Sequence, residues 1–393
     1  MATMILKINR RIKDIVGSTT LAITARANEL KAKGVDVVNF AAGEPDFDTP
    51  DDIKQAATEA IKKGFTKYTP TVGTLELRQA ISAKFRKDND LEYNPNQIVV
   101  SCGAKHSLYN IIQVLADDGD EVLIPSPYWV SYPEMVKCAG AVPKFLTTTP
   151  QTEFKITASQ LAKSITDNTR ILILNSPSNP TGMVYTKKEL ESIAEICVKN
   201  NIYAISDDIY EKLVYDTDEY TSIASLGKEI YDLTITVNGV SKAYAMTGWR
   251  IGYCAGPQEI IEYIKKFQDH STSNPTSISQ AAALKALQAP NESIERMRQE
   301  FKKRRDVILK ACDAIPEIRY LRPQGAFYLF CDISKVGDSN TFAKRILDEV
   351  NVALIPGDGF GAPGYVRLSF ATSVERIQEG MQRIARWIKQ SLK

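Results

Sequence analysis

Short apolar runs alternate with longer helical patterns through most of this chain, and that rhythm restricts the fold more than any other feature. The runs are rich in β-branched residues, and helical spacing follows several of them, as in Lys187–Lys199 after the turn at Thr181–Gly182. Strands that alternate with helices predict an α/β fold, a mostly parallel sheet with helices on both faces. The runs assigned to strands are Gln97–Val100, Glu121–Ile124, Arg170–Leu174, Ile202–Ile205, Leu233–Val237 and Ile251–Cys254.

The rhythm changes after about Pro290, where a long charged helix is expected from Glu292 to about Ala314. A smaller α+β unit is predicted here. It comprises short runs at Gly325–Cys331, Val352–Ile355 and Tyr365–Phe370 and a final helix from about Val374. The stretch up to about Phe47 lacks a parallel-sheet partner of its own, so we expect it to pack there too. We therefore divide the chain into an N-terminal arm with part of the small domain (1–46), a large domain (47–295) and a small C-terminal domain (296–393).

Composition excludes several classes of function. Lys and Arg total 49 and Asp and Glu 47, a net charge of +2, which gives no electrostatic reason to expect a nucleic-acid or membrane partner. Only two histidines are present, so a metal site with three His ligands is excluded, and we predict no metal. Six scattered cysteines without a C-x-x-C pair favour a reducing, cytoplasmic location.

The N-terminus carries too many early charges for a signal peptide, and no apolar run reaches the ~18–20 residues of a membrane span. A plastid or mitochondrial form whose transit peptide has been removed stays open. Two further motifs are discounted. Gly359–Gly364 matches G-x-G-x-x-G, but it contains a proline and leads into a strand, so we expect a turn. The basic run Lys302–Arg305 is predicted to be a solvated helix face.

Polar or glycine-containing segments follow four of the predicted strands. In an open α/β sheet, ligands bind beyond the carboxyl ends of the strands. Taken singly, each segment is explained as a turn, a helix cap or a surface charge. Together they favour one shared ligand site. The segments are Ser101–Lys105, which opens a helix, Asn175–Gly182 (NSPSNPTG), Ser206–Tyr210, and Asn238–Arg250, which contains Lys242.

These residue types match the needs of pyridoxal 5′-phosphate (PLP). Lys242 would form a Schiff base with the aldehyde, and Asp207 would keep the ring nitrogen protonated so that the ring accepts electrons. The Tyr210 phenol and the Asn179 amide would bond the ring hydroxyl. Arg250 and the helix start would neutralise the phosphate. The sequence therefore predicts PLP as the cofactor.

Several longer segments carry motifs of one known family. They are AAGEPDFDTP (Ala41–Pro50), the KYTP around Tyr68, PYWVSYPEM (Pro127–Met135), SPSNPTG, SDDIYE, VNGVSKAYAMTGWRIGY, PQGAFY and VRLSFATS. With these segments the chain resembles the class I aminotransferases of fold type I, and among them the bacterial-type aspartate aminotransferases of the I-gamma group. The resemblance runs from about Ile12 to the C-terminus. It implies that the large domain binds PLP.

The resemblance also implies a role for each matching residue. Lys242 would carry the cofactor and move a proton between the substrate and the cofactor, Asp207 would pair with the ring nitrogen, and Trp129 would stack on the ring. Arg367 would bind the substrate α-carboxylate, assisted by the Gly43 backbone. The remaining implied cofactor ligands are Gly103, Ala104, Lys105, Ser241 and Arg250 near the phosphate, Tyr210 and Asn179 at the ring hydroxyl, and Tyr68 from the neighbouring subunit of a homodimer.

The implied reaction is amino-group transfer between L-aspartate and 2-oxoglutarate by a PLP/PMP ping-pong mechanism. In relatives, the residue at Lys105 contacts the distal carboxylate of the substrate, helped by hydroxyls at the positions of Ser18 and Thr20. Relatives that use prephenate carry a basic residue at the place of Val16, which argues against that substrate here. An aminotransferase of the same fold with aromatic or prephenate/arogenate preference is the alternative, and a β-lyase of this fold also stays open.

Two hypotheses from other classes are less well supported. A PLP-binding transcription regulator would need an additional DNA-binding domain before the aminotransferase pattern, which here begins within the first ~20 residues. A nicotinamide oxidoreductase would depend on the Gly359–Gly364 match that we discount.

Overall fold

The computed structural model describes residues 8–217 and 219–392. Residues 1–7 lie outside the described part. They belong to the proposed N-terminal arm and to the segment whose charges argue against a signal peptide. The strands are β1 (Val38–Asn39), β2 (Ile98–Ser101), β3 (Glu121–Ser126), β4 (Val142–Thr147), β5 (Thr169–Asn175), β6 (Tyr203–Asp207), β7 (Thr234–Gly239), β8 (Gly252–Ala255), β9 (Arg319–Tyr320), β10 (Tyr328–Asp332), β11 (Val352–Ala353), β12 (Ile355–Pro356) and β13 (Tyr365–Ser369).

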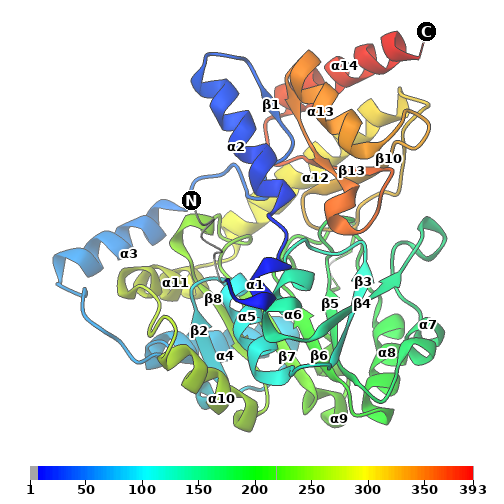
Figure 1. Cartoon of the computed structure of the whole chain (residues 1–393). Coiled ribbons are helices and arrows are strands. Elements are labelled where there is room, and N and C mark those ends of the chain that lie inside the picture. The colour runs from blue at the N-terminus through cyan, green and yellow to red at the C-terminus, as the bar shows by residue number, and fades with distance from the viewer. Residues whose placement is uncertain (1–7, 218, 393) are drawn as a thin grey trace, which may run out of the picture.

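Helices lie between most of these strands and at both ends of the chain (Figure 1). In the described ranges, no helix is both long enough and apolar enough to span a bilayer. The helices are α1 (Arg10–Lys13), α2 (Thr19–Ala32), α3 (Asp51–Lys62), α4 (Leu75–Asn89), α5 (Ala104–Leu115), α6 (Tyr132–Ala139), α7 (Ala158–Ser164), α8 (Lys187–Lys199), α9 (Lys228–Tyr231), α10 (Gln258–Asp269), α11 (Ser277–Gln288), α12 (Glu292–Asp313), α13 (Ser339–Val350) and α14 (Val374–Ser391).

The central sheet has seven strands in the order β2-β8-β7-β6-β5-β3-β4. Its pairs are parallel except for those on either side of β8, which runs antiparallel to β2 and β7. Alternate residues of one strand face different helix layers: on β5, Ile171 and Ile173 pack with α5, α6 and α10, whereas Leu172 and Leu174 pack with α8. Because both faces are covered, the strand is a continuous apolar run. The predicted fold class is confirmed.

A second, four-stranded antiparallel sheet has the order β12-β13-β10-β9. Residues of α12 and α14 pack against it in one apolar cluster. The N-terminal strand β1 pairs in parallel with β11, with Val38 opposite Val352. In Figure 1 the blue helix α2 accordingly lies beside the orange and red C-terminal elements. Strand β1 and helix α2 thus pack with the C-terminal unit, whereas α1 contacts α6 of the large domain, so the division of the chain into domains stays a prediction.

Several features of the fold differ from the sequence-based expectation. The two-residue strands β1 and β9 were not predicted. Strand β4 was not predicted, and it forms the edge of the central sheet beside β3. The prediction that Lys302–Arg305 is a solvated face was wrong for Arg304 and Arg305, which are buried, whereas Lys303 is exposed. Arg305 is 0% exposed, and its Nη1 and Nη2 donate to the Asp216 carboxylate at 2.6 and 3.0 Å. Both guanidinium groups pair with acids that are themselves partly exposed, Arg305 with Asp216 and Arg304 with Asp46.

The expected turn at Gly359–Gly364 is confirmed. A short 3-10 helix at Gly357–Phe360 follows β12, and the chain then enters β13 at Tyr365. No helix begins at this glycine segment, so it cannot offer the helix N-terminus that a dinucleotide pyrophosphate requires.

Candidate active site

A cavity of about 470 Å³ lies at the carboxyl ends of the central strands, where they meet α2 and the small sheet. It brings together residues that are far apart in the sequence, as expected for a site at the loop end of an α/β sheet. Most of the predicted site residues line it: Thr20, Gly43, Ala104, Lys105, Trp129, Asn179, Asp207, Tyr210, Ser241, Lys242, Arg250 and Arg367.

Lys242 follows β7 and reaches into this cavity. Its Nζ donates to the carbonyl oxygen of Gly43 at 2.6 Å and lies 5.7 Å from the ring centroid of Tyr210. Burial lowers the pKa of Lys242 to about 8, although the carboxylate of Glu44 opposes this shift. An amine with this pKa is partly neutral near physiological pH, and the neutral amine is the form that attacks a carbonyl group.

Asp207 ends strand β6 and is only 4% exposed. Its Oδ2 accepts a hydrogen bond of 2.6 Å from the Tyr132 hydroxyl, whereas its Oδ1 has no hydrogen-bond partner among the described residues. Burial raises the pKa of Asp207 to about 6, while hydrogen bonds from Tyr132 and the backbone of Ile209 lower it. A buried carboxylate oxygen without a partner is costly, and it suits a cationic N–H group of a ligand.

Arg367 extends from β13 into the opposite side of the cavity and is 2% exposed. Its Nη1 donates to the side chain of Asn179 at 3.0 Å, and its Nη2 donates to the carbonyl of Ala41 at 2.9 Å. The guanidinium lies 4.3 Å from the ring centroid of Tyr328, and its Nε has no partner among the described residues. Both hydrogen-bond acceptors of the guanidinium are neutral, so its buried charge favours an anionic ligand.

The predicted phosphate ligands Gly103 and Arg250 lie together at the start of α5. Gly103 caps this helix at φ +93°, and a Cβ at this position would lie 2.6 Å from Nη2 of Arg250. The Arg250 guanidinium donates to the carbonyls of Thr247 and Cys102, at 2.9 and 3.3 Å. The amide groups of a helix start and a nearby guanidinium both attract a phosphate. Gly103 therefore allows the guanidinium to approach the helix start closely.

Of the residues predicted to contact the distal carboxylate of the substrate, some line the cavity and one does not. Nζ of Lys105 lies 4.8 Å from the ring centroid of Trp129, and burial together with Arg250 lowers the pKa of Lys105. Thr20 lines the cavity, and its hydroxyl oxygen has no partner among the described residues. Ser18 does not line it; its hydroxyl caps α2 by accepting from the amide of Leu21 at 3.4 Å.

Tyr68 does not line the cavity of its own chain and is 92% exposed. Its predicted role at a neighbouring subunit's phosphate stays a prediction, as do the roles of the other predicted site residues.

The family model for aminotransferase class I and II matches residues 35–384. The chain belongs to this family. An aspartate aminotransferase from Bacillus sp. (strain YM-2) is 52% identical over 385 residues, which cover 96% of this chain and 98% of the relative. One from Bacillus subtilis (strain 168) is 46% identical over 390 residues, which cover 98% of this chain and 99% of the relative.

Among solved structures, the aspartate aminotransferase from Thermus thermophilus with maleate matches this chain with a TM-score of 0.94. The two are 43% identical, and the match covers 97% of this chain and 100% of the other. Membership in the aminotransferase class I and II family implies dependence on PLP and action on amino and oxo acids.

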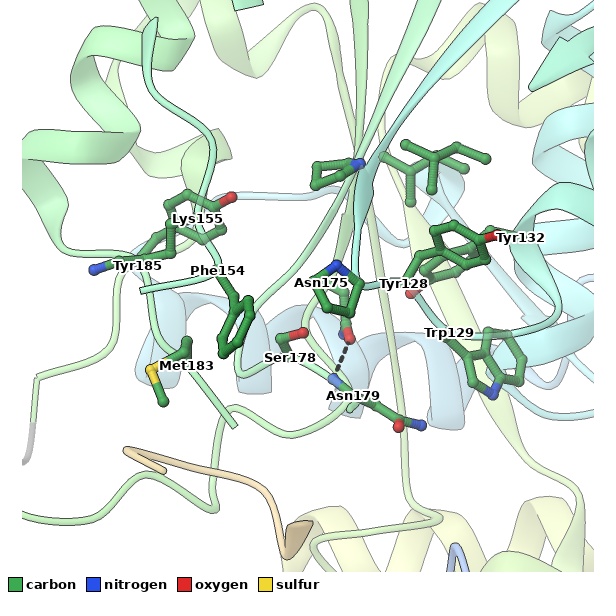
Figure 2. A pocket seen from close by; sticks show the side chains of 14 residues that line it. Tyr128, Trp129, Tyr132, Phe154, Lys155, Asn175, Ser178, Asn179, Met183 and Tyr185 are labelled. Atoms are coloured by element: carbon green, nitrogen blue, oxygen red, sulfur yellow. Dashed lines mark hydrogen bonds between the residues drawn. The ribbon is translucent and has the colours of Figure 1, made fainter. Parts of the chain in front are cut away.

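Two residues that hold the site together, Tyr132 and Asn175, were not predicted as site residues from the sequence. Tyr132 lies three positions after Trp129 in a quoted motif, but its contact with Asp207 depends on the tertiary fold. Asn175 ends β5: its Oδ1 accepts from the main-chain N–H of Asn179 at 2.8 Å, and its Nδ2 donates to the main-chain oxygen of Asp207 at 2.9 Å. Figure 2 shows the first of these bonds beside a small neighbouring cavity of about 20 Å³. Only the position of Asn175 at a strand end could have suggested its role.

Proposed function

We propose that this aminotransferase uses PLP to transfer the amino group between L-aspartate and 2-oxoglutarate, with the cofactor alternating between its aldehyde and amine forms. The observation that carries the proposal is the arrangement of three groups around one cavity: the Lys242 amine, Oδ1 of Asp207 and the guanidinium of Arg367. Among the described residues, Oδ1 of Asp207 and Nε of Arg367 have no hydrogen-bond partner. A PLP enzyme needs an amine, an acid and an anion site at these three places.

The residues around the cavity fit PLP. The partnerless Oδ1 of Asp207 is suited to a protonated ring nitrogen, and the cradle of Gly103, Ala104, Ser241 and Arg250 to a phosphate. Tyr210 and Asn179 would bond the ring hydroxyl, and Trp129 would cover the ring face. When bound, PLP supplies an aldehyde and a ring that accepts electrons from the substrate Cα. Lys242 would hold the aldehyde and carry the proton from and to the substrate Cα.

A dicarboxylate substrate is supported at both ends of the cavity. Arg367, with the Gly43 backbone, would bind the α-carboxylate in a bidentate manner, which the planar guanidinium favours. Lys105 and Thr20 would face the distal carboxylate, assisted by the Ser18 hydroxyl at the start of α2. The Thermus thermophilus relative is described with maleate, which is also a dicarboxylate. This similarity supports aspartate as the substrate.

We further propose a cytoplasmic homodimer in which Tyr68 completes the partner's phosphate site. The exposed hydroxyl of Tyr68 and the exposed apolar side chains of Ile61 and Phe65 support an interface at this end of α3. The free state of all six cysteines supports a reducing compartment.

The first test is Lys242→Ala. We expect this variant to bind PLP through the phosphate and ring contacts, without covalent attachment and with essentially no transamination between aspartate and 2-oxoglutarate. The measurements are the absorbance spectrum, borohydride trapping followed by peptide mapping, and turnover. Lys266→Ala, at an exposed lysine of α10, is the control and should behave like the unmodified enzyme. Full activity of Lys242→Ala would overturn the proposed function.

A further inference from the structure

Tyr132 is the first residue of α6, and its side chain is buried against the cofactor-facing acid. Its hydroxyl lies 2.6 Å from Oδ2 of Asp207, and its ring meets Trp129 edge-on with 5.3 Å between the centroids. Burial and the Asp207 charge raise the pKa of Tyr132 well above its ordinary value. The phenol therefore keeps its proton and acts as the hydrogen-bond donor to the carboxylate.

The bond makes the two oxygens of Asp207 unequal. Oδ2 is held by Tyr132, whereas Oδ1 is buried without a partner among the described residues. The main-chain oxygen of Asp207 is fixed separately by Nδ2 of Asn175. A carboxylate held at one oxygen cannot rotate freely about its last bond, so its free oxygen keeps one direction before any ligand arrives.

We propose that Tyr132 is a positioning residue: it holds Oδ2 of Asp207 so that Oδ1 is presented to the ring nitrogen of the cofactor. The proposal deepens the proposed function and rests on it. The competing explanation is that Tyr132 only fills space between Trp129 and β6. The two explanations differ in whether the effect of the hydroxyl depends on the ring nitrogen of the ligand.

The experiment compares two ligands on the full-length apoenzyme. Pyridoxamine 5′-phosphate binds without a covalent bond to Lys242, and its analogue with a carbon in place of the ring nitrogen offers Asp207 no N–H group. Calorimetry gives the affinity of the unmodified protein and of Tyr132→Phe for each ligand. Tyr185→Phe is the control, because Tyr185 is also buried and its hydroxyl accepts one hydrogen bond, from the amide of Ile156 at 3.0 Å, outside the active-site cavity.

We expect Tyr132→Phe to bind pyridoxamine 5′-phosphate about tenfold more weakly, because an Asp207 carboxylate that is no longer held in place must be ordered when the ligand binds. Its affinity for the carbon analogue should change by less than about twofold, and Tyr185→Phe should leave both affinities unchanged. In an Asp207→Ala background, Tyr132→Phe should have no further effect on either affinity. Unchanged binding of pyridoxamine 5′-phosphate, or an equal loss with both ligands, would overturn the positioning role.

A second readout does not depend on the ligand. Carbon-13 NMR of the apoenzyme follows the Asp207 carboxyl, whose pKa should rise in Tyr132→Phe because a donor to the charged form is lost. If that variant does not fold, fluorotyrosine can be placed at position 132 instead. Its hydroxyl is a stronger donor and should lower the pKa of Asp207. An unchanged pKa of Asp207 would refute the proposal. Failure of the unmodified protein to bind either ligand would instead contradict the proposed function.

Discussion

The surroundings of Lys242 disfavour its charged form, and this links catalysis to stability. The pKa of Lys242 in the folded state is about 8, below the ordinary value of 10.5, so the folded protein binds fewer protons than the unfolded chain between these two pH values. Stability should therefore rise as the pH increases from about 8 to 10.5, and below pH 8 the buried charge should carry its full penalty.

Lys242→Met should accordingly stabilise the apoenzyme at pH 7, by on the order of 1 kcal/mol after allowing for water in the cavity. The gain should decline as the pH rises from 8 to 10.5, because the unmodified protein then loses its penalty. Urea unfolding of both proteins across this pH range measures the difference. A gain that is the same at every pH would contradict the assigned pKa.

Lys105 is predicted to determine the substrate. If its ammonium group faces the distal carboxylate, Lys105→Ala should reduce kcat/KM for aspartate by about 1.5–3 kcal/mol, the contribution of a charge-assisted hydrogen bond. Alanine and aromatic amino acids lack that carboxylate and should be affected far less. The alternative is that Lys105 only adds charge near the phosphate. In that case kcat/KM would fall equally for all substrates and cofactor affinity would decrease. This result would refute the claim about specificity but not the proposed aminotransferase activity.

At the scale of elements, the start of α5 sets the position of Arg250. Gly103→Ala would place a methyl group 2.6 Å from Nη2 of Arg250, and the flexible end of that side chain would have to move away. We expect about tenfold weaker binding of pyridoxamine 5′-phosphate, because the guanidinium leaves the anion site. The positive φ of Gly103 adds roughly 1–2 kcal/mol of destabilisation.

Gly34→Ala is the matched control for this prediction. Gly34 also has a positive φ, +81°, but a Cβ there would meet no atom within 4 Å. The Gly34→Ala variant should lose a similar amount of free energy of unfolding, and its cofactor affinity should be unchanged. If both variants bind the cofactor like the unmodified protein, the close approach of Gly103 and Arg250 has no part in phosphate binding.

Elements with one strong local signal were predicted well, and elements that depend on their surroundings were not. Lys187–Lys199 was predicted with the bounds of α8 from its helical spacing after the turn at Thr181–Gly182. In the structure, a Thr186–Glu189 capping box also marks the start of this helix. Strand β4 lies at a sheet edge with a mixed pattern of exposure, so its sequence lacks the apolar run of the central strands. The buried guanidinium of Arg305 depends on Asp216, far away in the sequence, and composition cannot reveal that pairing.

At the scale of the whole molecule, the cavity is assembled from both ends of the chain. Motifs predicted Thr20, Asp207 and Arg367 as site residues, and they line one cavity. The distances between them could not be predicted from the sequence. Tyr132 and Asn175 were not predicted, because hydrogen bonds between residues far apart in the sequence leave no pattern along the chain. The pairing of β1 with β11 supports the proposed division at 1–46, 47–295 and 296–393, which stays a prediction.

The proposed sharing of Tyr68 between subunits can be tested with hybrid dimers. In a dimer of one Lys242→Ala subunit and one Tyr68→Ala subunit, the site built on the second subunit has an intact Lys242 and receives Tyr68 from the first. Such a hybrid should show about half the activity of the unmodified dimer, although each parent homodimer is strongly impaired. Two different affinity tags allow the hybrid to be purified, and turnover at limiting PLP is the measurement.

The control is the hybrid of a Lys242→Ala subunit with an unmodified subunit, which also has one complete site and should show the same half activity. If Tyr68 instead acts within its own chain, the subunit that keeps Lys242 lacks its Tyr68, and the mixed variant hybrid would have no intact site. Its activity would then not exceed half that of the Tyr68→Ala homodimer. This outcome would refute the shared site, and it would leave the roles of Lys242 and Asp207 unaffected because they lie within one chain.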